Sequence, residues 1–180
     1  LRSPGPCADS FAREFHREGI PLHVERGGFF DHVEISDLLS LLQLLDNPLQ
    51  DVPLLAVLRS PIVGMTLGEM AEIRLVRRKG PFWTALAAFH GMAPASLPKG
   101  AAQSAWDKAA RFWDALERWR GLIREESLSL CLETVLDDTH YEAWLAAEPR
   151  AEIRLANVRQ LLLMTRAFDQ LRRQGLFRFL

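Results

Sequence analysis

The stretch that decides the fold is residues 102–124, AQSAWDKAARFWDALERWRGLIR, in the second half of a 180-residue chain. Its apolar residues recur at intervals of three and four, which is the spacing of one face of an α-helix. They are Trp106, Ala109, Phe112, Trp113, Leu116, Trp119 and Ile123. An aromatic stripe of this kind is far more often part of a core than of a ligand site. The stretch therefore predicts a long helix that packs against other helices.

Shorter helical patterns surround this stretch. A leucine-rich run over 33–45 is apolar on most sides and predicts a buried helix. Thr66 and Glu69 match a capping box at the start of a helix. The predicted helices cover 33–45, 51–59, 66–78, 82–90, 102–124, 127–136, a short stretch with Tyr141 and Trp144 capped by Thr139, and 149–173 with Pro149 in its first turn. Residues 91–100 predict a loop. The expected fold class is mainly α, an irregular multi-helix domain.

The first residues follow a different pattern. Residues 8–18, with Phe11 and Phe15 four apart, suit an amphipathic helix, and residues 20–25 alternate apolar and polar as a half-buried strand does. One helix and one strand make only a fragment of an α/β domain. The chain begins without methionine and ends on an apolar Phe179-Leu180. We therefore expect both ends to be cuts through a longer protein.

Composition bounds the function classes. Hydrophobic residues make up 48% and the net charge is −1, so a sizeable core is expected and DNA contact requires a local basic patch. Cys7 and Cys131 form no CxxC pair or Cys/His cluster, as suits a reducing cytosol. No apolar run approaches the roughly 20 residues that a membrane span needs, and no signal peptide is evident. A cytoplasmic protein with no membrane contact is expected.

Sequence motifs for catalysis are missing. The chain has no GxxxxGK(S/T) phosphate loop, HExxH, GxSxG or GxGxxG. Asp137, Asp138 and His140 are close in sequence, but adjacent side chains on a helix point about 100° apart and converge poorly. A polar helix end is expected there. We expect no catalytic residue, cofactor or metal in this chain, and a stand-alone enzyme is the third hypothesis.

Clustered basic residues are the one chemical signal. Arg74, Arg77, Arg78 and Lys79 lie together without an acid, and residues 150–180 hold seven arginines against two acids, a local charge of +5. Those arginines include Arg154 and Arg159. Arginine suits phosphate because its planar guanidinium donates hydrogen bonds in pairs. The other interpretation is a solvated helix face with intramolecular acidic partners.

Residues 1–45 and 46–74 carry a family resemblance. The Arg2-Ser3 pair, Gly19-Ile20-Pro21, the Gly27-Gly28-Phe29-Phe30 turn and the leucine-rich helix with Glu34 follow the order found in UvrD/RecB-type superfamily 1 helicases. DNPLQDVPLLAVLRSPIVGMTLGEMAEIR, residues 46–74, is similar to AddA-type helicase-nuclease subunits. The tail, with its Ala156-Asn157-x-Arg159 helix, also looks like that family, whereas residues 80–147 match only as a helical pattern.

The resemblance implies an architecture and a function. Residues 1–47 would be a fragment of the second RecA-like helicase domain, with a short α/β part, and residues 48–180 the helical accessory domain 2B. The parent would be an ATP-dependent 3′–5′ translocase that uses ATP and Mg²⁺ and acts with a partner subunit on double-strand DNA ends in recombinational repair. The alternative is a helical protein-interaction module without direct DNA contact.

The resemblance also implies roles for individual residues. Arg2 and Ser3 would lie near the single strand in the motor groove, and Arg59 would lie at a hinge-like Arg-Ser-Pro turn. The basic residues of the helical part would contact duplex DNA and adjust affinity without performing chemistry. The residues that we expect to contact DNA are Arg2, Ser3, Arg59, Arg74, Arg77, Arg78, Lys79, Arg154 and Arg159.

Overall fold

The computed structural model describes residues 17, 28–97, 100–170 and 176–180. The chain divides into two compact units, residues 1–32 and 33–180. In the first unit, Phe29–Asp31 form a 3-10 turn, η1, in which the Asp31 carboxylate accepts a hydrogen bond from the Gly28 amide at 2.8 Å. The helix predicted over 8–18 and the strand predicted over 20–25 lie outside the described residues, except for Arg17, whose backbone is helical. The domain boundary at residue 47 stays a prediction.

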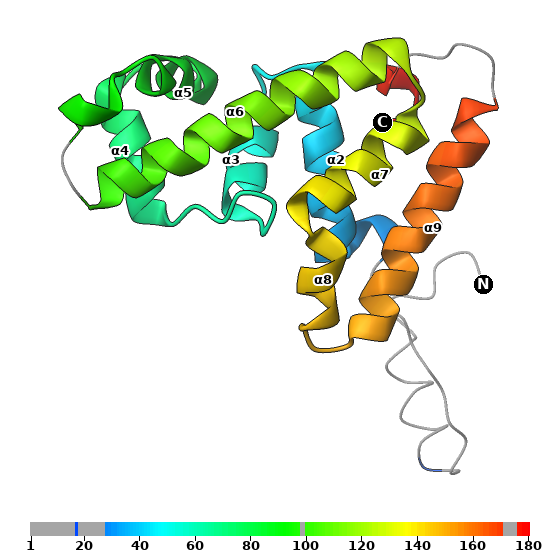
Figure 1. The fold of residues 1–180 in the computed structure, drawn as a ribbon. Coiled ribbons are helices and arrows are strands. Elements are labelled where there is room, and N and C mark those ends of the chain that lie inside the picture. Colours follow the sequence, from blue (N-terminus) through cyan, green and yellow to red (C-terminus); the bar gives the residue numbers. More distant parts are fainter. Residues whose placement is uncertain (1–16, 18–27, 98–99, 171–175) are drawn as a thin grey trace. The chain divides into compact units, whose positions relative to one another are not determined.

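The second unit is helical throughout its described residues, where no strand occurs. Its α-helices are α2 (Val33–Asp46), α3 (Asp51–Arg59), α4 (Leu67–Val76), α5 (Phe82–His90), α6 (Ala101–Glu125), α7 (Leu128–Thr139), α8 (Tyr141–Ala146) and α9 (Ala151–Asp169). Two short 3-10 turns are η2 (Pro94–Ser96) and η3 (Leu176–Arg178). The predicted mainly-α fold of irregularly packed helices is confirmed (Figure 1). None of the described helices is long and apolar enough to cross a membrane.

Helix α6 spans this unit and contacts four other helices. Helices α4 and α5 pack toward its beginning, and α2 and α7 pack toward its end (Figure 1). The stripe that predicted this helix lies on its core face: Ala109, Phe112, Leu116 and Trp119 are buried in the core, and Trp106, Trp113 and Ile123 are partly buried against it. Helix α5 adds Trp83, whose ring stacks on Trp113 with centroids 4.5 Å apart. The prediction that the aromatic stripe is part of the hydrophobic core is therefore confirmed.

Helix α2 is deeply buried. Ile35, Leu38, Leu41, Leu42 and Leu44 have no exposed surface. Each fully buried leucine or isoleucine contributes roughly 1.5–3 kcal/mol relative to an exposed one. The leucines point in several directions because α3, α6 and α9 all pack against this helix. This is why the helix is apolar on most of its circumference.

Polar bonds fix α2 to the C-terminal helices. The buried Glu34 carboxylate accepts a hydrogen bond from the Asn157 amide of α9 at 2.7 Å. One turn later, Asp37 accepts a hydrogen bond from the Tyr141 hydroxyl of α8 at 3.0 Å. Burial raises the pKa of Asp37, the Tyr141 hydrogen bond opposes this, and the nearby Glu34 charge adds to the rise. These bonds join residues more than 100 positions apart in the sequence. Glu34 therefore helps to hold α2 against α9.

Two predicted helix starts are wrong. Thr139 does not cap α8: it is the last residue of α7, and its hydroxyl donates to the Val135 carbonyl at 2.7 Å. The cap is His140, in left-handed backbone with φ of 51°. Pro149 is not in the first turn of α9, because Arg150, with φ of 62°, is the cap that precedes Ala151. At both junctions one left-handed residue redirects the chain, which needs neither a Ser/Thr cap nor a first-turn proline.

The predicted capping box at α4 is confirmed and extends to α6. The Thr66 hydroxyl accepts from the Glu69 amide, and the Glu69 carboxylate accepts from the Thr66 amide at 2.7 Å. Glu69 also accepts from the Ser104 hydroxyl and from the Lys108 ammonium at 2.9 Å. Burial raises the pKa of Glu69, but these hydrogen bonds and the Lys108 charge outweigh it and lower the pKa to about 2. One carboxylate therefore joins the start of α4 to α6.

We predict that Glu69→Gln lowers the free energy of unfolding by about 3 kcal/mol at pH 7, since each unit of pKa shift corresponds to about 1.4 kcal/mol. The folded pKa is depressed from 4.5 to about 2, so this stability is present above pH 4.5 and is lost as the pH falls toward 2. Urea unfolding at a series of pH values measures it. The control is Glu72→Gln on the same helix, because Glu72 makes no ion pair with any described residue. Equal losses for both variants at pH 7 would contradict the assignment.

Candidate nucleic-acid interface

The turn between α4 and α5 is built around Arg74. Its guanidinium donates to the Gly80 carbonyl at 2.9 Å and to the Arg77 carbonyl at 3.5 Å. It also lies 4.0 Å from the Asp51 carboxylate and 4.9 Å from the centre of the Phe82 ring. Asp51 in turn accepts from the Phe82 amide at 2.7 Å, at the start of α5. These contacts hold the turn in place, so Arg74 is a structural part of the basic cluster.

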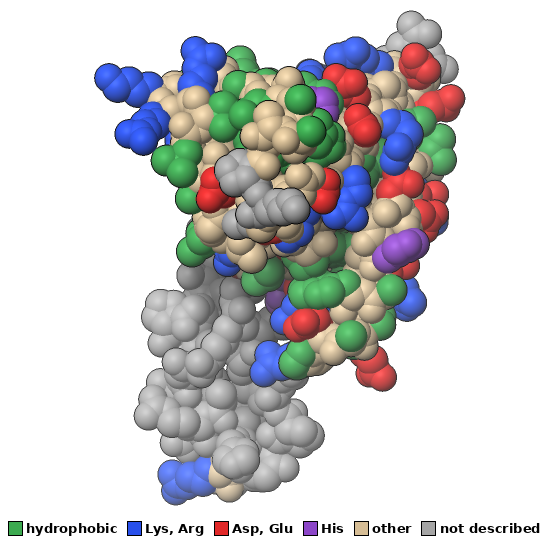
Figure 2. Space-filling view, turned by 60° about the vertical axis from the view of Figure 1, so that its left-hand side comes forward, with side chains coloured by type: hydrophobic (Ala, Val, Ile, Leu, Met, Phe, Trp, Pro, Cys, Tyr) green, Lys and Arg blue, Asp and Glu red, His purple; other side chains and the backbone are tan. Residues whose placement is uncertain are grey.

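Arg77, Arg78 and Lys79 project from this turn. All three are exposed and form no ion pair with any residue that the structure describes. Gly80, with φ of 87°, closes the turn in a conformation that favours glycine. Leu75 and Val76 beside them are 56% and 41% exposed. Figure 2 shows exposed Lys and Arg side chains next to exposed hydrophobic ones, with the cations gathered at the upper left above the hydrophobic side chains. We define Arg77, Arg78 and Lys79 as the turn cluster.

The other predicted contact residues lie apart from the turn cluster. Arg59 donates to the Met65 carbonyl at 3.3 Å and so braces the turn after α3. Arg154 is half-buried. Burial and the neighbouring Asp37 carboxylate raise the pKa of Tyr141, and the Arg154 charge only partly opposes this rise. Arg159 is exposed on α9, a helix that packs on α2, α7 and α8, away from α4 and α5 (Figure 1). Arg2 and Ser3 lie outside the described residues. The predicted arginines that the structure describes therefore do not form one continuous face.

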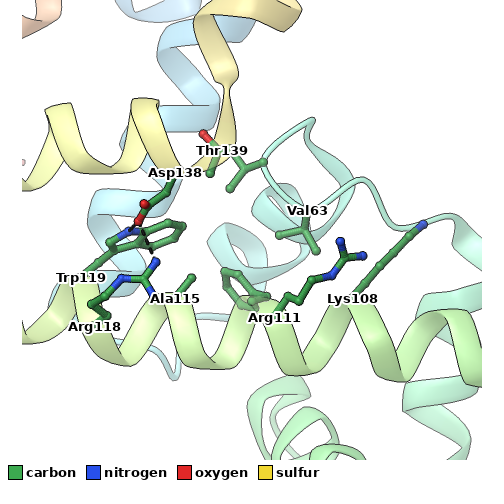
Figure 3. Close-up of a pocket in the computed structure, with 10 residues that line it drawn as sticks. Val63, Lys108, Arg111, Ala115, Arg118, Trp119, Asp138 and Thr139 are labelled. Atoms are coloured by element: carbon green, nitrogen blue, oxygen red, sulfur yellow. Dashed lines mark hydrogen bonds and ion pairs between the residues drawn. The ribbon is translucent and has the colours of Figure 1, made fainter.

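A groove that sequence reasoning missed lies along α6. Its volume is about 340 Å³, and its walls come from the turn after α3, from α6 and from the end of α7 (Figure 3). The lining residues are Ile62, Val63, Lys108, Arg111, Phe112, Ala115, Arg118, Trp119, Asp138 and Thr139. Lys108, Arg111 and Arg118 recur at intervals of three and seven, a helical spacing that could have been read from the sequence. What could not be read is that residues 62–63 and 138–139 cover this face.

Asp138 closes one end of the groove. Its carboxylate accepts from the Arg118 guanidinium at 2.7 Å and from the Trp119 indole N–H at 2.8 Å. Burial raises the pKa of Asp138, but these two hydrogen bonds and the charges of Arg118 and His140 lower it overall. The Asp137-Asp138-His140 sequence is a polar helix end, as predicted. Among the residues that the structure describes, no group of His, Cys, Asp and Glu is arranged to hold a metal ion.

Cys131 is a core residue. It is fully buried on α7, and its thiol donates to the Trp119 carbonyl at 3.6 Å. Burial raises the pKa of this thiol to about 12. Because the thiolate is the reactive form of cysteine, a thiol with so high a pKa is a poor nucleophile.

The chain matches known proteins over its whole length. Residues 2–81 match the model of the UvrD-like helicase C-terminal domain. The A subunit of the ATP-dependent helicase/nuclease of Lysinibacillus sphaericus is 42% identical over 93% of this chain, and that of Acetivibrio thermocellus is 40% identical over 100% of it. The corresponding protein from Bacillus velezensis is 37% identical over 97%. The chain spans only 13–14% of the length of these relatives.

These matches define the class of protein. Helical folding over residues 33–180 and the family match over residues 2–81 together identify part of a UvrD-like helicase. Within that class, the chain belongs to the AddA-type helicase/nuclease subunits and corresponds to a segment of them. The resemblance carried by residues 1–74 and by the tail is confirmed, and the relatives also cover residues 80–147, where the sequence alone offered only a helical pattern.

We predict that Asp138→Ala lowers the free energy of unfolding by about 1–3 kcal/mol, because it leaves the buried Trp119 indole N–H without an acceptor. Trp119 is only 1% exposed, so water does not replace the carboxylate readily. Thermal and urea unfolding measure the loss. Asp137→Ala is the matched control on the same helix, because Asp137 is also exposed but its side chain makes no hydrogen bond or ion pair with a described residue. A loss from Asp137→Ala as large as that from Asp138→Ala would contradict the role assigned to Asp138.

Proposed function

We propose that this chain comprises the end of one pass through the second RecA-like domain and the accessory domain 2B of an ATP-dependent 3′–5′ DNA helicase/exonuclease subunit. The parent protein acts on double-strand DNA ends in recombinational repair, in the bacterial cytoplasm and together with a partner subunit. ATP and Mg²⁺ bind to parts of the parent outside these 180 residues. The segment itself contributes contact with DNA, whereas motor and nuclease chemistry belong to the rest of the protein.

The turn cluster is the observation that carries this proposal. Three adjacent exposed cations stand on a turn whose backbone is held by Arg74, and no described acid neutralises them. Such a group suits the phosphates of a duplex, because phosphate contacts need positive charge at a fixed position and no reading of bases. The names of the relatives, which are helicases and nucleases, agree with a DNA partner. Arg74 supports the contact by positioning it.

A second candidate function is docking of a partner protein. Helix α9 exposes Ile153 at 44% and Leu163 at 56%, and α7 beside it exposes Leu130 at 41%. Arg166 of α9 is paired with Glu133 of α7 at 2.6 Å, so this arginine, one turn after Leu163, is already neutralised. Exposed apolar residues beside paired charges are typical of protein contacts. This side of the molecule is therefore the better candidate for a helicase-nuclease partner subunit.

We predict that replacing Arg77, Arg78 and Lys79 by alanine weakens binding of the 180-residue chain to a short duplex and flattens its salt dependence. Each lost phosphate contact lowers the slope of log affinity against log salt by about 0.9. Fluorescence anisotropy at several salt concentrations measures both effects. The single variants separate the three cations.

Arg124→Ala is the control for the turn cluster. Arg124 is exposed near the end of α6, so the variant changes the net charge as one turn-cluster variant does. Its expected effect on the slope is small. An unchanged slope for the triple variant would exclude the turn cluster as a phosphate contact, and absence of binding at low salt would favour docking of a partner protein.

A further inference from the structure

The groove along α6 carries a row of cations with one unpaired member. Lys108, Arg111 and Arg118 lie on one helix face, and the first and last are ten steps apart, about 15 Å at the helical rise of 1.5 Å per residue. Lys108 is bound to Glu69 and to the Gly64 carbonyl, at 2.9 and 2.7 Å. Arg118 is bound to Asp138. The first and last cations of the row are therefore already neutralised.

Arg111 is different. Its Nε donates to the Asp107 carbonyl at 3.2 Å, which orients the side chain, and the guanidinium forms no ion pair with any described residue. In Figure 3 it extends from α6 toward Val63, between Lys108 and the Arg118–Asp138 pair. The small side chain of Ala115, one turn further along, leaves the space beside it open. An oriented guanidinium with free N–H donors in a concave site is suited to binding an oxyanion.

We propose that this groove binds the phosphodiester backbone of a single DNA strand, with Arg111 as the phosphate contact. The inference rests on the proposed function and adds a second contact that differs from the turn cluster in shape. The turn cluster projects and suits a duplex. A groove of about 340 Å³ is the size of a small-molecule pocket and admits one strand, but not a duplex.

The walls of the groove favour a nucleic-acid backbone over an acidic peptide. Ile62, Val63 and Ala115 offer apolar surface and no side-chain hydrogen bond. A sugar–phosphate backbone alternates a charged group with a largely apolar sugar edge, which matches a guanidinium that has Ile62, Val63 and Ala115 beside it in an otherwise polar groove. A peptide would bring backbone donors and acceptors that these side chains leave unsatisfied. The aromatic residues Phe112 and Trp119 are buried, so no stacking of bases is expected and the contact should be independent of sequence.

The test is anisotropy binding of the 180-residue chain to a short oligonucleotide, single-stranded or duplex, at several salt concentrations. We expect Arg111→Ala to lower single-strand affinity roughly tenfold, as loss of one charged hydrogen bond does, and to lower its salt slope by about 0.7. Duplex affinity should change less. Ala115→Glu should have the same effect with the arginine kept, because a glutamate four residues after Arg111 occupies the groove and pairs with it.

Two control variants separate the groove from general charge. Arg124→Ala removes an exposed arginine from the same helix. Gly121→Glu adds a carboxylate on α6 where a side chain meets open space. Arg124→Ala should alter single-strand binding less than Arg111→Ala, and Gly121→Glu less than Ala115→Glu. Unfolding curves of all four variants should show that each is folded.

The outcomes distinguish this inference from the proposed function. Loss of single-strand binding in Arg111→Ala and Ala115→Glu, but not in the controls, supports the groove. Unchanged single-strand binding in both groove variants, while the turn-cluster triple variant loses duplex binding, overturns the groove and leaves the proposed function standing. Absence of any DNA binding by the unaltered chain overturns both. Binding of a polyglutamate peptide that depends on Arg111, without an effect on DNA, also overturns the groove and favours a protein ligand.

Discussion

The burial of one face of α6 is the constraint on which the rest of the helical unit depends. Ala105, Ala109, Phe112, Leu116 and Trp119 form a continuous apolar face about 20 Å long, by the helical rise of 1.5 Å per residue. No single short helix covers such a length, so α4 and α5 bury its first part and α2 and α7 its last part. Because the helix is amphipathic, the same packing turns Lys108, Arg111 and Arg118 toward the groove. The core and the candidate site therefore lie on adjoining faces of one helix, and Phe112 and Trp119 belong to both.

The net charge of −1 conceals how the charges are used. Several acids bind backbone amides or buried donors: Glu34 holds Asn157, Asp51 holds the Phe82 amide, Asp138 holds Trp119, and Asp169 holds the amides of Leu128 and Ser129. Carboxylates placed in this way stabilise helix starts and helix contacts. They do not neutralise the turn cluster or Arg111. A chain with nearly equal numbers of acids and bases can thus present local positive charge without being basic overall.

The sequence predicted the parts of the fold that depend on local chemistry. The bounds of α3 and α5, and the Thr66–Glu69 capping box, were predicted because periodicity and caps act within a few residues. The starts of α8 and α9 were not predicted, because His140 and Arg150 adopt a left-handed backbone conformation that neither residue type favours. The family resemblance was confirmed because its motifs are contiguous.

The candidate sites were predicted less completely for a related reason. The turn cluster is contiguous, so its charge could be seen in the sequence. The structural function of Arg74 could not, because it depends on Asp51 and Phe82, which reach it through tertiary packing. The groove was missed since its walls come from residues 62–63, 108–119 and 138–139. Such a site exists only after α3, α6 and α7 have assembled.

Helix α4 links the two candidate DNA contacts physically. Arg74 near its end holds the turn that carries Arg77, Arg78 and Lys79. Glu69 near its start binds Lys108 of the groove and Ser104 on α6. A helix of ten residues, about 15 Å long, is rigid on this scale, so the turn cluster and the groove keep a fixed relation to each other. A DNA junction, where a duplex meets a single strand, presents both kinds of phosphate backbone at once. Contacts held at the two ends of one short helix would suit such a junction better than either form of DNA alone.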